Sequence, residues 1–254
     1  MTHFDLHVHT TFCDGAASPE EMVKAAVALG CPRLGFSAHA PMPHPSYAMK
    51  KEDEAAYRAE ILRLRKAYAD RIEILLGLEV DLWSLPVTEP YDYIIGSVHS
   101  LSPVDKEGRR ADVDGPVSIL EAAIERDFGG DAYAACEDYF ASVARLGELS
   151  PSIIGHFDLI RKHNRGGRLF DESSPRYLAA AYAAIDALLP LGIPFEVNTG
   201  GISRGYIDTP YPAEPLLSYI LKKGGRVILT GDAHRTENLC YQFDRWSEYV
   251  DSLR

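Results

Sequence analysis

Histidines are the residues of this 254-residue chain whose positions most clearly suggest chemistry. Of nine, six lie at or just past the C-terminal ends of segments that we predict as strands: His7, His9, His39, His99, His156 and His234. In parallel α/β proteins such strand ends meet at one face, where binding and catalytic residues gather. A single histidine in such a place is usually structural. Six of them, over five predicted strands, indicate a shared site.

The spacing of these residues favours metal chelation. His7 and His9 are two residues apart, so both side chains project from the same face of a strand. Asp232 and His234 repeat this arrangement on the last predicted strand. Same-face pairs of this kind can hold one metal ion or bridge two neighbouring ions.

Carboxylates accompany the histidines. Asp14 lies in the first loop, and Glu79 ends the third predicted strand. Asp81 follows Glu79 by two residues and is a weaker ligand candidate, and Asp5 sits deeper in the first strand as a buried polar residue. A mixture of imidazole and carboxylate ligands suits Zn, Mn or Fe and does not suit thiolate chemistry.

Short apolar segments alternate with helical patterns along the whole chain, which predicts an α/β fold. The predicted strands are His3–His9, Leu34–His39, Ile72–Val80, Tyr93–His99, Ile153–His156, Ile193–Asn198 and Arg226–Asp232. The predicted helices are Ser18–Gly30, Glu52–Tyr68, Asp131–Leu146, Pro175–Leu189, Ala213–Lys223 and Glu237–Leu253. Seven strands separated by helices favour a (β/α) barrel in a single domain, residues 1–254, over an open doubly wound sheet.

One long segment, Leu101–Gly115, shows neither pattern. It is rich in charged residues, so we expect either a solvated surface loop or a lid over a site at the end of the preceding strand. Within it, Glu107, Asp112 and Asp114 could form an acidic wall for a cationic substrate group, and Tyr206 or Tyr211 could form an aromatic one.

Charge and composition narrow the functional classes. The net charge of -11, from 26 Lys+Arg and 37 Asp+Glu, gives a long-range field of the wrong sign for nucleic acid or an anionic membrane. Four scattered cysteines without a CxxC motif argue against a zinc knuckle and a disulfide framework. The chain shows no secretory signal or membrane span, so we expect a cytoplasmic protein with a small-molecule substrate.

The ordered motifs DLHVHTTFCDG, FSAHAP, GLEVD, SVHS, GHFD, EVNT and GDAH make the chain resemble the PHP (polymerase and histidinol-phosphatase) superfamily of metal-dependent phosphoesterases. The run EVNTGGISRGY is most similar to its histidinol-phosphatase branch. This resemblance implies a distorted (β/α)7 TIM-like barrel, the PHP fold. It also implies hydrolysis of the phosphomonoester L-histidinol phosphate in histidine biosynthesis.

The resemblance further implies two to three divalent transition-metal ions (Zn, Mn or Fe). The first would take His7, His9, Glu79 and Asp232. The second would share Glu79 as a bridge and add His99 and His156. The third would take Asp14, His39 and His234, with Asp14 standing where many relatives have histidine.

A hydroxide shared between two metals would then attack phosphorus, because their combined charge lowers the pKa of a bound water. The leaving group would receive its proton from Asp232, from His234 or from a metal-bound water. Arginine suits bidentate contact with phosphate oxygens, so we predict Arg161 and Arg204 as substrate-binding residues. His44, in a Pro-rich loop after His39, is a further candidate for substrate contact.

Three other functions fit parts of the pattern. A PHP-type phosphodiesterase or exonuclease should show a basic track with stacking aromatic residues, which the overall acidity disfavours. A non-catalytic metal-binding scaffold should have lost ligands, whereas all nine positions here can bind metal. A metal-dependent amidohydrolase usually has a bridging lysine, and no lysine lies at a predicted strand end.

Overall fold

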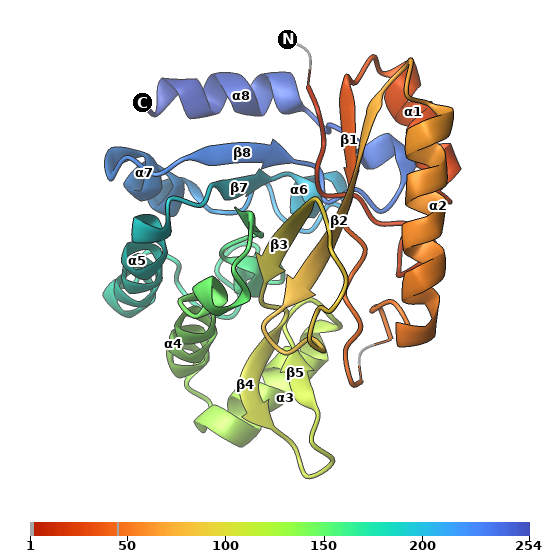
Figure 1. Ribbon diagram of the computed structural model, residues 1–254. Coiled ribbons are helices and arrows are strands. Elements are labelled where there is room, and N and C mark those ends of the chain that lie inside the picture. Colours follow the sequence, from red (N-terminus) through yellow and green to blue (C-terminus); the bar gives the residue numbers. More distant parts are fainter. Residues whose placement is uncertain (1–2, 45) are drawn as a thin grey trace.

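The structure is a computed structural model that describes residues 3–44 and 46–254. Its described residues form a parallel sheet of six strands in the order β1-β2-β3-β6-β7-β8 (Figure 1). These strands are β1 (Arg33–Phe36), β2 (Glu73–Asp81), β3 (Tyr93–Ser97), β6 (Ile153–Ile154), β7 (Phe195–Asn198) and β8 (Val227–Thr230). The sheet is curled and carries helices on its outer face, which confirms the predicted α/β architecture.

Residues 5–9 lie between the two edge strands. Single bridges join Asp5 to Leu34 and Val8 to Ala233, in each case parallel. The Asp5 carboxylate also accepts backbone N–H groups of Gly231 and Cys240, at 2.9 and 3.1 Å. The prediction of a strand over His3–His9 is confirmed only in part. Backbone bonds join the segment to both neighbours, as from the Gly35 N–H to the Asp5 carbonyl and from the His9 N–H to the Ala233 carbonyl. Side chains of Asp5 and Ser37 interrupt this ladder by accepting other backbone N–H groups.

The six predicted helices are all present, with shifted ends. They are α1 (Pro19–Ala28), α2 (Glu54–Ala67), α4 (Ala132–Val143), α5 (Pro175–Leu188), α7 (Glu214–Lys222) and α8 (Phe243–Ser252). The structure adds α3 (Val117–Phe128), α6 (Gly200–Ser203) and short 3-10 turns at Lys51–Asp53, Leu146–Leu149, Leu159–Arg161, Leu189–Leu191 and Thr236–Asn238. Ser18 and Glu21 form the expected capping box of α1. In the part of the chain that is described, no helix combines the length and apolar character needed to cross a membrane.

The charged segment Leu101–Gly115 is not irregular. It contains an antiparallel hairpin of β4 (Ser100–Val104) and β5 (Arg110–Asp112), which extends beyond the C-terminal ends of β2 and β3 (Figure 1). The Asp105 carboxylate closes the turn by accepting the N–H groups of Glu107 and Arg109, and Gly108 supplies a positive φ of 77°. The hairpin thus forms around hydrogen bonds of the Asp105 side chain, although its sequence lacks the alternation of apolar and polar residues that predicts strands.

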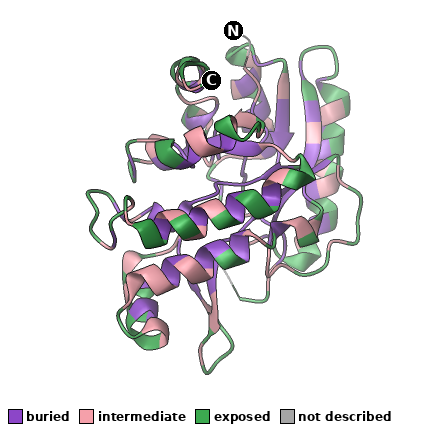
Figure 2. Ribbon diagram, turned by 90° about the vertical axis from the view of Figure 1, so that its left-hand side faces the viewer, coloured by how far each residue is buried: buried purple, intermediate pink, exposed green. Residues whose placement is uncertain are grey.

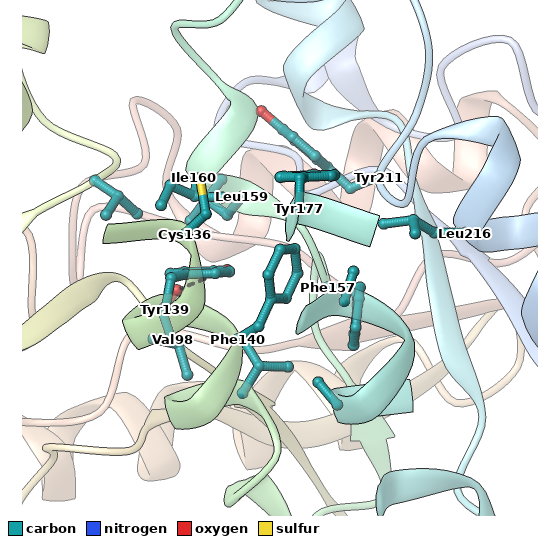
Figure 3. Packing of buried hydrophobic residues seen from close by; sticks show 14 of the residues in the cluster. Val98, Cys136, Tyr139, Phe140, Phe157, Leu159, Ile160, Tyr177, Tyr211 and Leu216 are labelled. Atoms are coloured by element: carbon teal, nitrogen blue, oxygen red, sulfur yellow. Dashed lines mark hydrogen bonds between the residues drawn. The ribbon is translucent and has the colours of Figure 1, made fainter. Parts of the chain in front are cut away.

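The helices bury one side against the sheet and expose the other (Figure 2). Beneath α4 and α5, fully buried aromatic side chains such as Phe140, Phe157 and Tyr177 pack together, and the Tyr139 hydroxyl donates to the Val98 carbonyl (Figure 3). This packing fixes the end of β6, directly before His156.

A tyrosine side chain fills the inside of the curled sheet, between residues 5–9 and strands β1 and β2. The buried Tyr93 hydroxyl donates to the carbonyls of Leu6 and Phe36, at 2.7 and 3.0 Å. Its ring lies against Gly77, where a Cβ would stand 2.2 Å from the ring. Only glycine fits there, and the filled interior leaves the strand ends as the place for a site.

Candidate metal centre

The structure brings all nine predicted metal ligands together at the C-terminal ends of the strands. They form overlapping groups whose donor atoms lie within 4.8 Å of one another: His9, Asp14, His39 and His234; His7, His156 and Asp232; His7, His9 and Glu79; His39, Glu79 and His99. The groups share members, so the arrangement is one continuous cluster that can hold more than one ion.

Glu79 lies at the centre of this cluster. Its Oε2 is 3.2 Å from His7 Nε2, 3.4 Å from His9 Nε2 and 2.9 Å from His39 Nδ1. Its Oε1 lies 3.3 Å from His99 Nε2 and 2.9 Å from His156 Nε2. The side chain is fully buried at the end of β2 and is placed to bridge two ions.

Asp232 is positioned by an unusual backbone. It adopts a left-handed φ of 47°, which aspartate tolerates better than most residues. Its Oδ1 lies 3.3 Å from His9 Nε2 and 3.7 Å from His7 Nε2. A Cβ on Gly200, at the start of α6, would stand 2.7 Å from the Asp232 Cβ. Glycine at 200 therefore makes room for this ligand.

Asp14, His39 and His234 form the outer part of the cluster. The Asp14 carboxylate lies 3.1 Å from His234 Nε2 and 3.7 Å from His39 Nε2. A tight loop brings Asp14 back over the strand end, with the Gly15 N–H donating to the Thr10 carbonyl at 3.1 Å. Unlike Glu79, Asp14 is exposed, so this part of the cluster faces the cavity.

Buried polar atoms without partners support metal binding. His7 Nε2, His9 Nε2 and Glu79 Oε2 are inaccessible to solvent and, despite their close neighbours in the cluster, make no hydrogen bond of good geometry among the described residues. Such atoms are costly unless something satisfies them. Cations placed between the histidine nitrogens and the carboxylate would satisfy all three, so the residues present fit a metal centre.

The electrostatics agree with this arrangement. Burial alone would lower the pKa of His7, but the negative charges of Glu196 and Glu79 raise it well above its usual range. Burial, with the neighbouring charge of His234, lowers the pKa of His9 to about 3. His9 is thus neutral and ready to coordinate, while His7 holds a proton that a metal ion would displace.

A cavity of about 760 Å³ opens above the cluster. Asp14 and His234 lie on its floor, and His44 and Arg204 lie on its walls. Arg204 donates to Asp232 Oδ2 at 3.0 Å, and its Nη1 lies 2.7 Å from His234 Nδ1. Its guanidinium is therefore adjacent to the candidate metal ligands, where an anionic group would bind.

Arg161 is placed differently from the prediction. Its guanidinium is buried and donates to Glu172, Thr209 Oγ1 and the Pro210 carbonyl, at 3.0, 2.8 and 3.2 Å. Among the described residues, those that line the cavity include its neighbour Lys162 and not Arg161. Arg161 lies at the end of the short 3-10 turn Leu159–Arg161, with its guanidinium bonded away from the cavity lining, so this arrangement does not support the predicted phosphate contact.

Some of the acidic and aromatic residues that we predicted as walls for a cationic substrate group do line the cavity. Asp112, Asp114 and Tyr206 line the cavity, whereas Glu107 and the buried Tyr211 are not among its described lining residues. Asp114 pairs with Lys162 Nζ at 2.6 Å. Burial raises the pKa of Asp112, whose carboxylate accepts the backbone N–H of Asp114.

Sequence reasoning missed two residues that contact the cluster or its cavity, Tyr47 and Glu196, and gave Asp81 only as a weaker ligand candidate. Tyr47 lines the cavity, with its ring 4.8 Å from that of His39. Glu196 and Asp81 lie behind His7 and His99, bonded to their Nδ1 atoms at 2.6 and 3.1 Å. A charged residue inside the apolar strand PFEVN was a usable signal for Glu196.

Comparisons with known proteins agree with this site. A model of the PHP domain family matches residues 5–200. A protein of Deinococcus radiodurans named "Probable histidinol-phosphatase" is 33% identical over 256 residues, covering 94% of this chain and 89% of that protein. The "Histidinol-phosphatase" of Bacillus subtilis (strain 168) is 27% identical over 277 residues, covering 98% and 99%.

A solved structure shows the same fold. Histidinol phosphate phosphatase from Lactococcus lactis subsp. lactis, complexed with zinc, L-histidinol and phosphate, matches with a TM-score of 0.74 at 20% identity. The match covers 99% of this chain and 94% of that one. The likeness therefore extends past residue 200, through the segment that carries Asp232 and His234.

Proposed function

The chain belongs to the PHP domain family, and from this membership we propose that it hydrolyses the phosphomonoester L-histidinol phosphate to L-histidinol and phosphate. The observation that carries the proposal is the convergence of nine metal-binding side chains beneath a cavity with both cationic and acidic walls. The relatives named as histidinol-phosphatases support this substrate.

Two to three divalent ions form the proposed cofactor. His7, His9, Glu79 and Asp232 would hold the first, and Glu79, His99 and His156 the second. Asp14, His39 and His234 would hold a third. Such ions supply a water of lowered pKa and positive charge for the phosphate oxygens. We propose residues 1–254 as one catalytic domain, because its ligands extend from His7 to His234.

Arg204 is the residue that we propose for binding the phosphate group. It reaches the cavity from the loop after α6 and is already aligned with Asp232 and His234. Negative neighbours keep it charged, since Asp232 raises its pKa against the lowering effect of burial. Lys162 adds a second cation at the same wall, held by Asp114. These cations let a protein of net charge -11 accept a dianionic ester.

The acidic side of the cavity suits the organic part of the substrate. The amine of histidinol is a cation at neutral pH, and its imidazole is a flat ring. Asp112 offers a partly buried carboxylate that lines the cavity and accepts the backbone N–H of Asp114 through Oδ1. A carboxylate has further lone pairs with which to accept from an amine. Tyr47 and Tyr206 offer ring faces on the same cavity. We assign the amine to Asp112, which lines the same cavity as the phosphate-binding cations.

Steady-state kinetics on a substrate panel test the function. Metal-loaded protein should be assayed with histidinol phosphate, p-nitrophenyl phosphate and a phosphodiester, and elemental analysis should count ions per chain. We expect two to three first-row transition ions and a clear preference in kcat/KM for histidinol phosphate. Equal kcat/KM for the two monoesters would reject the substrate, and active protein without metal would reject the centre.

A further inference from the structure

Beneath the proposed metal centre lie two buried carboxylates that we have not placed among the ligands. Glu196, on β7, is fully buried. Its Oε1 lies 2.6 Å from His7 Nδ1, and its Oε2 accepts the backbone N–H of His156 at 2.8 Å and the Asn198 side-chain amide at 3.0 Å. One carboxylate thus contacts two residues that we place at different metal ions.

Asp81, at the end of β2, makes the corresponding contact on the other side. Its Oδ2 accepts the backbone N–H of His99 at 2.7 Å and lies 3.1 Å from His99 Nδ1. Its Oδ1 accepts the N–H of Trp83 at 2.7 Å, which fixes the carboxylate in turn. Asp81 is 2% exposed and therefore presents these oxygens without competition from bulk water.

These contacts determine which ring nitrogen is free. A neutral imidazole carries its proton on one nitrogen and a lone pair on the other. A carboxylate acceptor at Nδ1 keeps the proton there, so that Nε2 offers its lone pair. In His7 and His99, Nε2 is the nitrogen that lies near Glu79.

Among the described residues, two other histidine ligands, His156 and His9, lack a carboxylate of this kind behind the ring. The Nδ1 of His39 contacts Glu79, which is itself a proposed ligand. His156 Nδ1 is buried with no hydrogen-bond partner in the described part of the chain. His9 Nδ1 lies 3.5 Å from the Cys13 thiol, a weak partner. Carboxylate support is thus found at His7, which we place at the first ion, and at His99, which we place at the second.

We propose that Glu196 and Asp81 are positioning residues that hold His7 and His99 in the Nδ1–H tautomer and thereby set the metal affinity of the two buried sites. The inference rests on the proposed metal centre. The inference goes beyond the metal centre, because it states that two side chains outside the ligand set control the histidine tautomers and the metal affinity. Replacing such a partner typically weakens metal binding by ~10–100-fold.

Glu196→Gln is the sharpest test, because it keeps the size of the side chain. A glutamine has a single acceptor oxygen, whereas Glu196 must serve both His7 Nδ1 and the N–H groups beside it. Glu54→Gln is the matched control. Glu54 is also a buried glutamate, and its partners Lys51 and Tyr91 do not belong to the cluster.

The measurements are the Zn²⁺ dissociation constants, by competition with a chromophoric chelator, and the visible absorption of the Co²⁺-loaded proteins. We expect Glu196→Gln to weaken one site by ~10–100-fold and to shift the Co²⁺ spectrum. Asp81→Asn should weaken a different site to a similar extent. Glu54→Gln should leave affinities and spectrum as in the wild type. Thermal unfolding of the metal-free proteins reports any general loss of stability separately.

The outcomes separate the inference from the proposed function. A wild-type protein that binds no Zn²⁺ would reject the metal centre itself. Wild-type binding with unchanged affinity and spectrum in Glu196→Gln would reject the positioning role alone. If Glu196→Gln fails to fold, Asp81→Asn decides by the same criteria. Weakening by Glu54→Gln equal to that by Glu196→Gln would reject the role as well, because burial of any carboxylate would then explain it.

Discussion

The floor and the walls of the cavity are built in different ways. The floor is the metal-binding cluster, which meets the cavity at Asp14 and His234 and continues beneath it. Its buried members include Glu79, near the end of β2, and His7 and His9, in the segment bridged to Leu34 and Ala233. The walls come from loops, the β4–β5 hairpin and the segment around Lys162, and their charged groups pair with one another, as Asp114 does with Lys162 at 2.6 Å. We therefore expect the fixed, buried ligands of the floor to carry the chemistry, and the charged loop residues of the walls to select the substrate.

The largest expected effect is on the floor. Glu79→Gln removes one negative charge that lies within 3.4 Å of five histidine rings. We expect kcat to fall by well over the ~10–100-fold typical of a residue behind a ligand, together with loss of bound metal. Elemental analysis and kcat at saturating substrate measure both. Retained metal with normal turnover would show that Glu79 does not bridge the ions.

The next effect lies where floor and wall meet. Arg204→Ala should raise KM more than it lowers kcat, because the substrate phosphate is already a dianion before reaction. Loss of a hydrogen bond to a charged group corresponds to roughly a 10- to 150-fold lower kcat/KM. Arg204→Lys keeps the positive charge but lacks a guanidinium that can make two parallel hydrogen bonds to phosphate. Its kcat/KM should therefore lie between those of Arg204→Ala and the wild type.

Metal content must be measured in both Arg204 variants, because Arg204 also contacts Asp232 and His234. An unchanged KM in Arg204→Ala with full metal occupancy would remove this residue from the phosphate site. A fall in metal content would instead show that it belongs to the floor, as a partner of the ligands.

The same division explains what the sequence could reveal. Glu79 lies near the C-terminal end of the buried strand β2, and His7 and His9 lie two residues apart in a segment bridged in parallel to the sheet. The direction of parallel strands dictates which end of the sheet carries the site. Their convergence was therefore predictable from spacing alone. The placement of the Asp232 side chain was not, because it depends on its left-handed backbone and on space left by Gly200, a residue distant in the sequence.

The walls were harder to predict because loop direction depends on tertiary contacts. Arg161 and Lys162 are adjacent and chemically similar, yet one is bonded to Glu172 and the other lines the cavity. Likewise, the hairpin within Leu101–Gly115 depends on the turn that Asp105 closes. Its sequence shows little alternation of apolar and polar residues, so the pattern did not indicate strands. The segment's second predicted role, a cover over the site, agrees with its lining residues Asp112 and Asp114.

A smaller and more selective effect is expected at the acidic wall. Asp112→Asn should raise KM for histidinol phosphate by about 10-fold, the cost of a weakened hydrogen bond to a charged amine. The kcat/KM for p-nitrophenyl phosphate should stay the same, because that ester carries no amine. Equal losses for both substrates would place Asp112 with the phosphate or the metals, and would break the division between floor and walls.

The smallest kinetic effect is expected from Arg161→Ala. Its guanidinium lies behind the wall and bonds to Glu172, Thr209 and Pro210, so KM for histidinol phosphate should stay near the wild-type value. Stability should fall instead. Burial raises the pKa of the nearby Asp158 to about 6, and the positive charge of Arg161 opposes that rise.

Removing one partner of a buried ion pair typically costs about 3–5 kcal/mol. Asp158 Oδ2 lies 3.8 Å from Arg161 Nε, and without this cation its buried charge at neutral pH loses its main compensation. Chemical denaturation should therefore show a lower free energy of unfolding for Arg161→Ala, while kinetics at a temperature where the variant is folded should be normal. A large rise in KM with unchanged stability would return Arg161 to the phosphate site, because only a residue that contacts substrate could produce that combination.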